Sequence, residues 1–185
     1  MTTFDEPARL ASLYAAQAQA QALFAGIEAA GLIRAGVLES VLSNEIHALA
    51  AEQFGVQAHW HRKIVRTGAN TVATFHDPTP DLTIAADDIL FLDFGPVFDN
   101  WEADFGRTFV LGDDRVKQAL RRDLGVVWTE LRDVYEAHPD ITGEQLYAEA
   151  HRAAERRGWI FGGQIAGHLV GSSRTQRSRA SALSR

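Results

Sequence analysis

The chain contains no cysteine, which excludes disulfides, thiolate metal sites and a cysteine nucleophile. It also has no apolar run approaching the ~20 residues that a membrane-spanning helix needs. Residues 1–10 carry acids where a secretion signal would have a basic region and an apolar core. We therefore expect a cytoplasmic protein with no membrane partner.

Three common catalytic and nucleotide-binding motifs are missing as well: a Walker loop, a His-Glu-x-x-His zinc motif and a Gly-x-Ser-x-Gly nucleophile elbow. Gly162-Gly163 lacks the strand-glycine-helix context of a dinucleotide site. These absences remove the most familiar nucleotide-dependent and serine-dependent activities.

Length and composition are ordinary for one globular domain. The 185 residues are 46% hydrophobic and 23% charged, enough to form a single core. The net charge of −6 argues against a nucleic-acid partner. Residues 172–185 hold four arginines and no acid, so residues 1–171 carry −10. We expect an acidic domain over residues 1–171 and a disordered basic tail over 172–185.

Helical periodicity and capping residues predict four helices. The first pair should cover about 7–31 and 38–54, each followed by a glycine stop. A third follows the capping acids 113–114 and covers 115–137. Thr142 and Gln145 have capping-box spacing and begin a fourth, which ends near 157. Short strands are predicted over 63–67, 71–75 and 82–84.

The stretch 89–111 predicts a β-ribbon that carries two acids. An apolar run at 89–92 forms the first arm, and Asp99-Asn100 supplies a turn before the second. An antiparallel return over eleven residues can bring the carboxylates of Asp93 and Asp104 together. Such a pair repels, and a divalent cation would neutralise it. The alternative is a pair of solvated acids, with Arg107 pairing Asp104.

The residues around these acids strengthen the metal interpretation. DFG at 93–95 and WEADFGRT at 101–108 resemble the aspartate signature of the pita-bread metallopeptidases, which include methionine aminopeptidase, Xaa-Pro aminopeptidase, prolidase and the metal-free relative creatinase. That signature is Asp-x-Gly, a turn, an aromatic residue and Asp-x-x-Arg-Thr. The resemblance implies that Asp93 chelates one metal ion and that Asp104 bridges two. The metal would be manganese, cobalt or zinc.

Further histidines follow from the same resemblance. Gly167-His168-Leu169 resembles the family's Gly-His motif, and His168 lies 64 residues after Asp104, as a metal ligand should. His76 follows a Gly-x-Asn turn loosely and would position substrate, although the family spacing lands on Phe75.

His59 and His61 alternate and could share one strand face, but such pairs are more often incidental.

The family's next His-Glu pair and its two later glutamate ligands do not follow His168 in these residues. A frameshift or truncation after residue 171 is one explanation, and a natural basic tail is the other. We therefore expect at most weak binding of one ion, little peptidase turnover, and self-association through an exposed sheet edge to form a homo-oligomer.

The expected fold is α+β. It is the pita-bread fold, a curved antiparallel sheet with helices on one face, whose C-terminal strands are missing. The expected function is that of an Xaa-Pro peptidase-like metal-dependent aminopeptidase, impaired in this chain, with a peptide as its substrate. The alternatives are a non-catalytic pseudoenzyme that binds a peptide or partner, and a non-functional fragment of a disrupted gene.

Overall fold

The computed structural model describes residues 5–173, which belong to two compact units. The first unit contains the described residues of Met1–Thr71, Pro80–Leu111 and Val170–Arg185. The second unit contains Val72–Thr79 and Gly112–Leu169.

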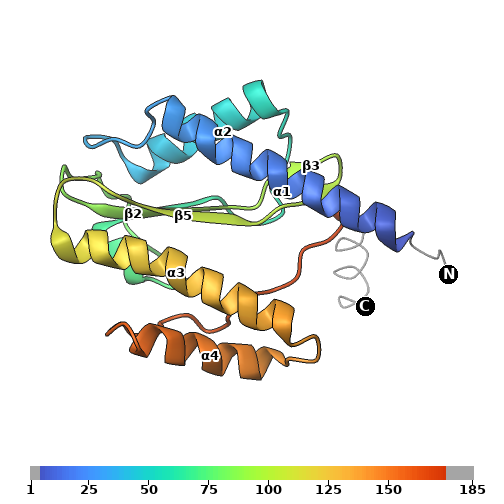
Figure 1. Cartoon of the computed structure of the whole chain (residues 1–185). Coiled ribbons are helices and arrows are strands. Elements are labelled where there is room, and N and C mark those ends of the chain that lie inside the picture. Colours follow the sequence, from blue (N-terminus) through green and yellow to red (C-terminus); the bar gives the residue numbers. More distant parts are fainter. Residues whose placement is uncertain (1–4, 174–185) are drawn as a thin grey trace. The chain divides into compact units, whose positions relative to one another are not determined.

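Two helices of the first unit lie close to their predicted bounds. Helix α1 covers Glu6–Ala29, and the side chain of Asp5 caps its first turn. Helix α2 covers Glu39–Phe54 and ends at Gly55, whose φ of 67° is the left-handed conformation that glycine adopts without strain. Both helices pack over one face of the sheet (Figure 1).

The sheet has three antiparallel strands in the order β1-β2-β5. They are β1 (Ile64–Thr67), β2 (Ile89–Phe94) and β5 (Phe105–Val110). Leu90, Leu92 and Phe94 point into the core beneath α1 and α2, because alternate residues of a strand share a face. The other face of β2 is therefore available for functional side chains.

The predicted β-ribbon is confirmed, with an additional short hairpin at its tip. Strands β3 (Val97–Phe98) and β4 (Trp101–Glu102) pair around Asp99 and Asn100. Both turn residues have positive φ, 48° and 70°, a conformation that Asp and Asn tolerate better than most residues. Beyond the hairpin, β5 returns along β2 and pairs with it in register.

The predicted strand over 71–75 is wrong. Residues Gly68–Val72 form a 3₁₀ helix, η1, instead. The Asn70 side chain donates to the buried carboxylate of Glu39 at 2.9 and 3.0 Å and to the Pro80 carbonyl at 2.8 Å. These tertiary bonds hold the turn in a conformation that local β propensity did not indicate. The predicted strand over 82–84 is reduced to one bridge between Thr83 and Leu38.

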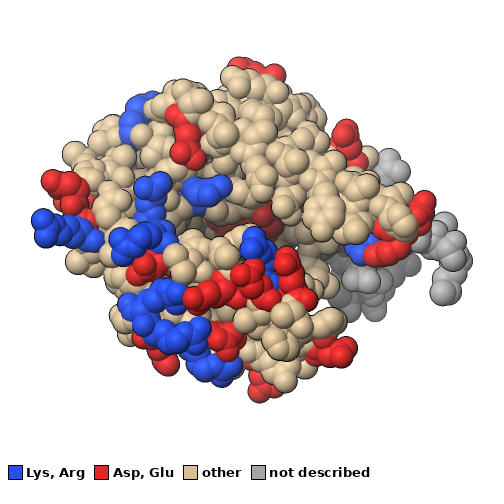
Figure 2. Space-filling model, in the orientation of Figure 1, with Lys and Arg blue, Asp and Glu red and all other residues tan. Residues whose placement is uncertain are grey.

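The second unit is built on two helices, α3 (Arg115–Ala137) and α4 (Gly143–Glu155), which pack together. The predicted capping box between Thr142 and Gln145 is present. Charges of both signs interleave over these helices (Figure 2). Arg157 pairs with Glu130 there, so part of this charge is neutralised locally.

The last described residues return to the first unit. The N–H of Glu102 donates to the Gly171 carbonyl at 2.9 Å, and the N–H of Gly171 donates to the Glu102 carboxylate at 3.2 Å. The N–H of Ser173 donates to the Asn100 carbonyl. The remainder of the basic tail, 174–185, lies outside the described residues. Within the described part of the chain, no helix is both long and apolar enough to span a bilayer.

Candidate metal centre

Asp93 is positioned by the alternation of β2. Its neighbours Leu92 and Phe94 face the core, so its own side chain projects from the opposite face of the sheet. In the ladder, Asp93 lies opposite Ile64 of β1 and Gly106 of β5. A central strand paired on both sides holds the position of this carboxylate firmly.

Asp104 is positioned by the backbone just before β5. The N–H of the preceding residue, Ala103, donates to the Pro96 carbonyl at 2.9 Å. The Ala103 carbonyl in turn accepts a hydrogen bond from the Trp60 indole Nε1–H at 2.9 Å. These two bonds fix the chain on both sides of the ribbon where Asp104 begins the return arm.

His61 reaches the ribbon because the preceding residues run alongside it. The N–H of Trp60 donates to the Gly95 carbonyl at 2.9 Å, and the N–H of Val97 donates to the Ala58 carbonyl at 3.0 Å. Gly95 leaves the space that the two rings occupy: a Cβ there would lie 2.4 Å from His61 Cδ2 and 2.6 Å from Trp60 Nε1. The absence of a side chain at residue 95 is therefore a packing requirement.

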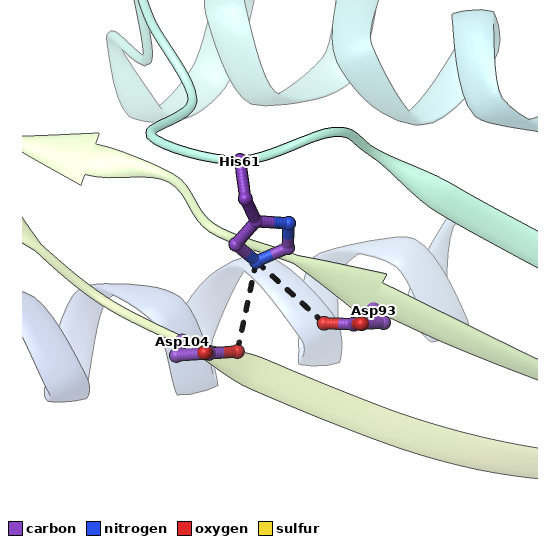
Figure 3. A group of neighbouring side chains, drawn as sticks. All are labelled: His61, Asp93 and Asp104. Atoms are coloured by element: carbon purple, nitrogen blue, oxygen red, sulfur yellow. Dashed lines mark ion pairs between the residues drawn. The ribbon is translucent and has the colours of Figure 1, made fainter. Parts of the chain in front are cut away.

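The three side chains converge on one point (Figure 3). His61 Nε2 lies 3.6 Å from Asp93 Oδ1 and 3.7 Å from Asp104 Oδ1. One candidate ligand atom from each residue lies within 4.8 Å of the other two. The His61 side chain is only 10% exposed, whereas the Asp93 and Asp104 side chains are 32% and 25% exposed. The cluster therefore has a buried nitrogen and two oxygens that solvent can reach.

A hydrogen bond at Nδ1 of His61, the ring nitrogen that faces away from the two acids, fixes the tautomer of the ring. Nδ1 lies 2.7 Å from the Arg62 carbonyl oxygen, which can only accept, so Nδ1 carries a hydrogen. Burial lowers the pKa of His61, but the hydrogen bond with Asp104, that with Arg62 and the charges of both acids outweigh it, and the net shift is upward. The two acids therefore favour a positive charge at the His61 ring.

His59 does not join this cluster, although the sequence spacing allowed it to share a face with His61. Its ring lies 5.5 Å from that of His47 and 6.0 Å from that of Phe94. Burial, followed by the positive charge of Lys63, lowers the pKa of His59 to about 4. His59 is thus neutral near pH 7 and belongs to the packing between α2 and the ribbon.

The low pKa of His59 predicts an acid-sensitive contribution to stability. The unfolded chain binds a proton at His59 below about pH 6.5, while the folded chain does not until about pH 4. The contribution is therefore complete above pH 6.5 and is lost as the pH falls toward 4. In urea denaturation with a chelator present, the free energy of unfolding should fall more steeply for the wild type than for His59→Gln as the pH is lowered from 6.5 to 4. Identical pH profiles would contradict the assignment.

The other two histidines predicted from the resemblance belong to the second unit. His76 is exposed, and its ring contacts that of Phe75 at 5.1 Å. His168 is exposed in a segment without regular secondary structure, three residues before Gly171. Their predicted roles, substrate positioning and metal binding, stay predictions.

Comparison with known proteins agrees with this geometry. The sequence pattern of metallopeptidase family M24 matches residues 11–182. The chain belongs to this family. It is 28% identical over 159 residues to the Xaa-Pro dipeptidase of Lactobacillus helveticus, a match that covers 84% of the chain and 41% of that relative. The chain therefore spans about two fifths of that relative's length.

Solved structures give the same fold. The Xaa-Pro dipeptidase from Bacillus anthracis is 24% identical with a TM-score of 0.64, over 89% of this chain and 45% of that one. The prolidase from Pyrococcus horikoshii is 19% identical with a TM-score of 0.65, over 88% of this chain and 46% of that one. The predicted α+β pita-bread fold is confirmed.

Two members of the cluster, Asp93 and Asp104, are predicted from the sequence of the ribbon. The third, His61, is not, because its alternation with His59 is more typical of an incidental pair. The contacts that accompany the approach of the ring to the acids involve Trp60 and Gly95. They form only when segments 35 residues apart lie side by side, so no signal along the chain identifies them.

Proposed function

We propose that this M24-family chain binds a divalent metal ion through Asp93, Asp104 and His168, and binds the N-terminal part of an Xaa-Pro peptide beside it. The observation that carries the proposal is the convergence of the Asp93 and Asp104 carboxylates, in a chain of a metallopeptidase family. The Xaa-Pro class is supported by the named relative, an Xaa-Pro dipeptidase. Manganese, cobalt and zinc are the candidate ions.

The residues present fit such an ion chemically. Carboxylate oxygens and an imidazole nitrogen suit manganese, cobalt and zinc, and the absence of cysteine excludes a thiolate site. Two acids on adjacent arms of a ribbon would also repel each other less with a cation between them. His168 enters the proposal from the Gly167-His168-Leu169 motif of the sequence.

Each side chain has a separable role in this proposal. When bound, the ion would polarise the scissile carbonyl and lower the pKa of a water molecule. Asp93 and Asp104 supply the negative charge that holds it, and their partial exposure leaves room for a peptide. His76 is proposed to hydrogen-bond the peptide and hold it in place.

A dipeptide-binding experiment tests the proposal. Calorimetry should detect binding of Ala-Pro when Mn²⁺ is present and much weaker binding after chelation, because the ion contributes direct contacts to the peptide. Ala-Ala is the matched ligand and should bind more weakly, since it lacks the proline ring. Binding that is indifferent to Mn²⁺ would overturn the proposal. Release of free proline by the wild type that Asp104→Asn abolishes would support the peptidase assignment.

A further inference from the structure

We propose that His61 is itself a metal ligand, so that His61, Asp93 and Asp104 together hold one divalent ion within the first unit. This inference rests on the metal site of the proposed function but adds a ligand to it. It makes a three-ligand site of one nitrogen and two oxygens that does not depend on His168. Water and substrate would complete the coordination of the ion.

The spacing of the three ligand atoms suits an ion between them. Metal–ligand bonds of about 2.0–2.2 Å place neighbouring ligand atoms roughly 3–3.6 Å apart, from octahedral to tetrahedral geometry. His61 Nε2 lies 3.6 Å from Asp93 Oδ1, at the upper end of that range, and 3.7 Å from Asp104 Oδ1, just beyond it. A small inward movement of the acids would complete the site.

The second nitrogen of His61 has the partner that a metal-binding histidine needs. Histidines that bind metals usually donate their other ring N–H to a backbone carbonyl or a carboxylate, which fixes the tautomer and the ring orientation. Here Nδ1 donates to the Arg62 carbonyl at 2.7 Å. That bond leaves Nε2, the atom facing Asp93 and Asp104, to bind the ion.

The ring is held in this orientation before any ion arrives. Its side chain is nine-tenths buried, and the Trp60 ring packs edge-on against it with centroids 4.5 Å apart. Trp60 is in turn anchored to the Ala103 carbonyl, one residue before Asp104. Gly95 provides the space for both rings. A ligand that is already oriented loses little conformational entropy when the ion binds.

The competing explanation is that His61 is an imidazolium that neutralises the two acids. The two explanations predict effects of opposite direction. If His61 is a ligand, its removal weakens metal binding. If it is a competing cation, its removal leaves two unneutralised acids, which would bind a divalent ion at least as tightly as before.

The test is a titration of the full-length chain with Co²⁺ and with Mn²⁺. Calorimetry measures the binding of both ions, and visible absorption also monitors the binding of Co²⁺. We expect His61→Ala to weaken binding at least about 10-fold, since even outer-shell partners of a metal ligand contribute that much. The Co²⁺ spectrum should also change as a nitrogen ligand is lost. His61→Gln, which keeps a polar side chain of similar reach, should also bind the ion more weakly than the wild type. His138→Ala is the matched control and should behave as wild type, because His138 is exposed on the second unit.

The outcomes separate this inference from the proposed function. Unchanged or tighter binding by both His61 variants, with binding still lost in Asp104→Asn, would overturn the inference and leave the proposed metal site intact. A wild-type chain that binds neither ion would overturn both. Circular dichroism in the presence of a chelator identifies a misfolded variant, and the His61→Gln result then decides.

Discussion

Replacing Asp104 with asparagine is expected to abolish the stabilisation that a divalent metal gives this chain. The change removes one of two carboxylates that face the same point, and a neutral amide is a much weaker ligand for manganese or zinc. A ligand that binds only the folded state raises stability by about 2.7 kcal/mol at 100 times its Kd. Excess Mn²⁺ should therefore raise the thermal unfolding temperature of the wild type and leave that of Asp104→Asn unchanged.

Asp99→Asn is the matched control for this change. Asp99 lies on the turn of the same ribbon, is exposed and has a φ of 48°, a conformation that asparagine also adopts. It should keep the full metal-induced shift. Without metal and at a pH where His61 is neutral, Asp104→Asn should be at least as stable as the wild type, because the repulsion with Asp93 is reduced. An undiminished metal shift in Asp104→Asn would place the metal elsewhere and remove the basis of the proposed function.

Substituting Gly95 with alanine is expected to destabilise the fold and the metal site together. The new Cβ would lie 2.4 Å from His61 Cδ2 and 2.6 Å from Trp60 Nε1, so at least one ring must move. Overpacking of this kind costs about 1–3 kcal/mol. Movement of Trp60 would also strain its hydrogen bond to the Ala103 carbonyl. Urea denaturation measures the loss of stability, and Mn²⁺ titration measures the effect on the site.

Gly106→Ala is the matched control, because Gly106 lies directly across the ladder from Asp93. The nearest atom to its new Cβ is the Leu92 carbonyl oxygen at 3.6 Å, an ordinary contact. Gly106→Ala should lower the free energy of unfolding far less than Gly95→Ala does. The double variant of Gly95→Ala with His61→Ala should be more stable than the sum of the two single effects predicts, since one clashing ring is gone. Equal stability of the two glycine variants would contradict the packing argument.

The cluster of His61, Asp93 and Asp104 is positioned by a small number of hydrogen bonds to the backbone. Asp93 depends on its position in a central strand, Asp104 on the bonds of Ala103, and His61 on the bonds of Trp60. None of these supporting contacts involves the functional side chain itself. Substitutions at Trp60 or Gly95 should therefore disturb metal binding without removing any ligand, as supporting residues of metal sites do.

Local signals accounted for the helices and for the ribbon. Ala- and Leu-rich periodicity, the Thr142–Gln145 capping box and the glycine stop at Gly55 each act within a few residues, so their consequences are readable along the chain. The same holds for the Asp99-Asn100 turn, whose side chains favour positive φ. The failed strand over 71–75 is instructive by contrast. Its apolar and β-branched residues favour extension, but Asn70 is held by Glu39, 31 residues earlier.

The sequence by itself determined the two acids and their spacing, because the ribbon that joins them closes over only eleven residues and its register follows from a local turn. Only the tertiary structure decided that His61 joins them and that His59 does not. The first depends on residues 58–60 lying beside 95–97, and the second on His59 packing against His47. Contacts between distant segments carry no periodic signature along a single chain, so they become visible only once the chain has folded.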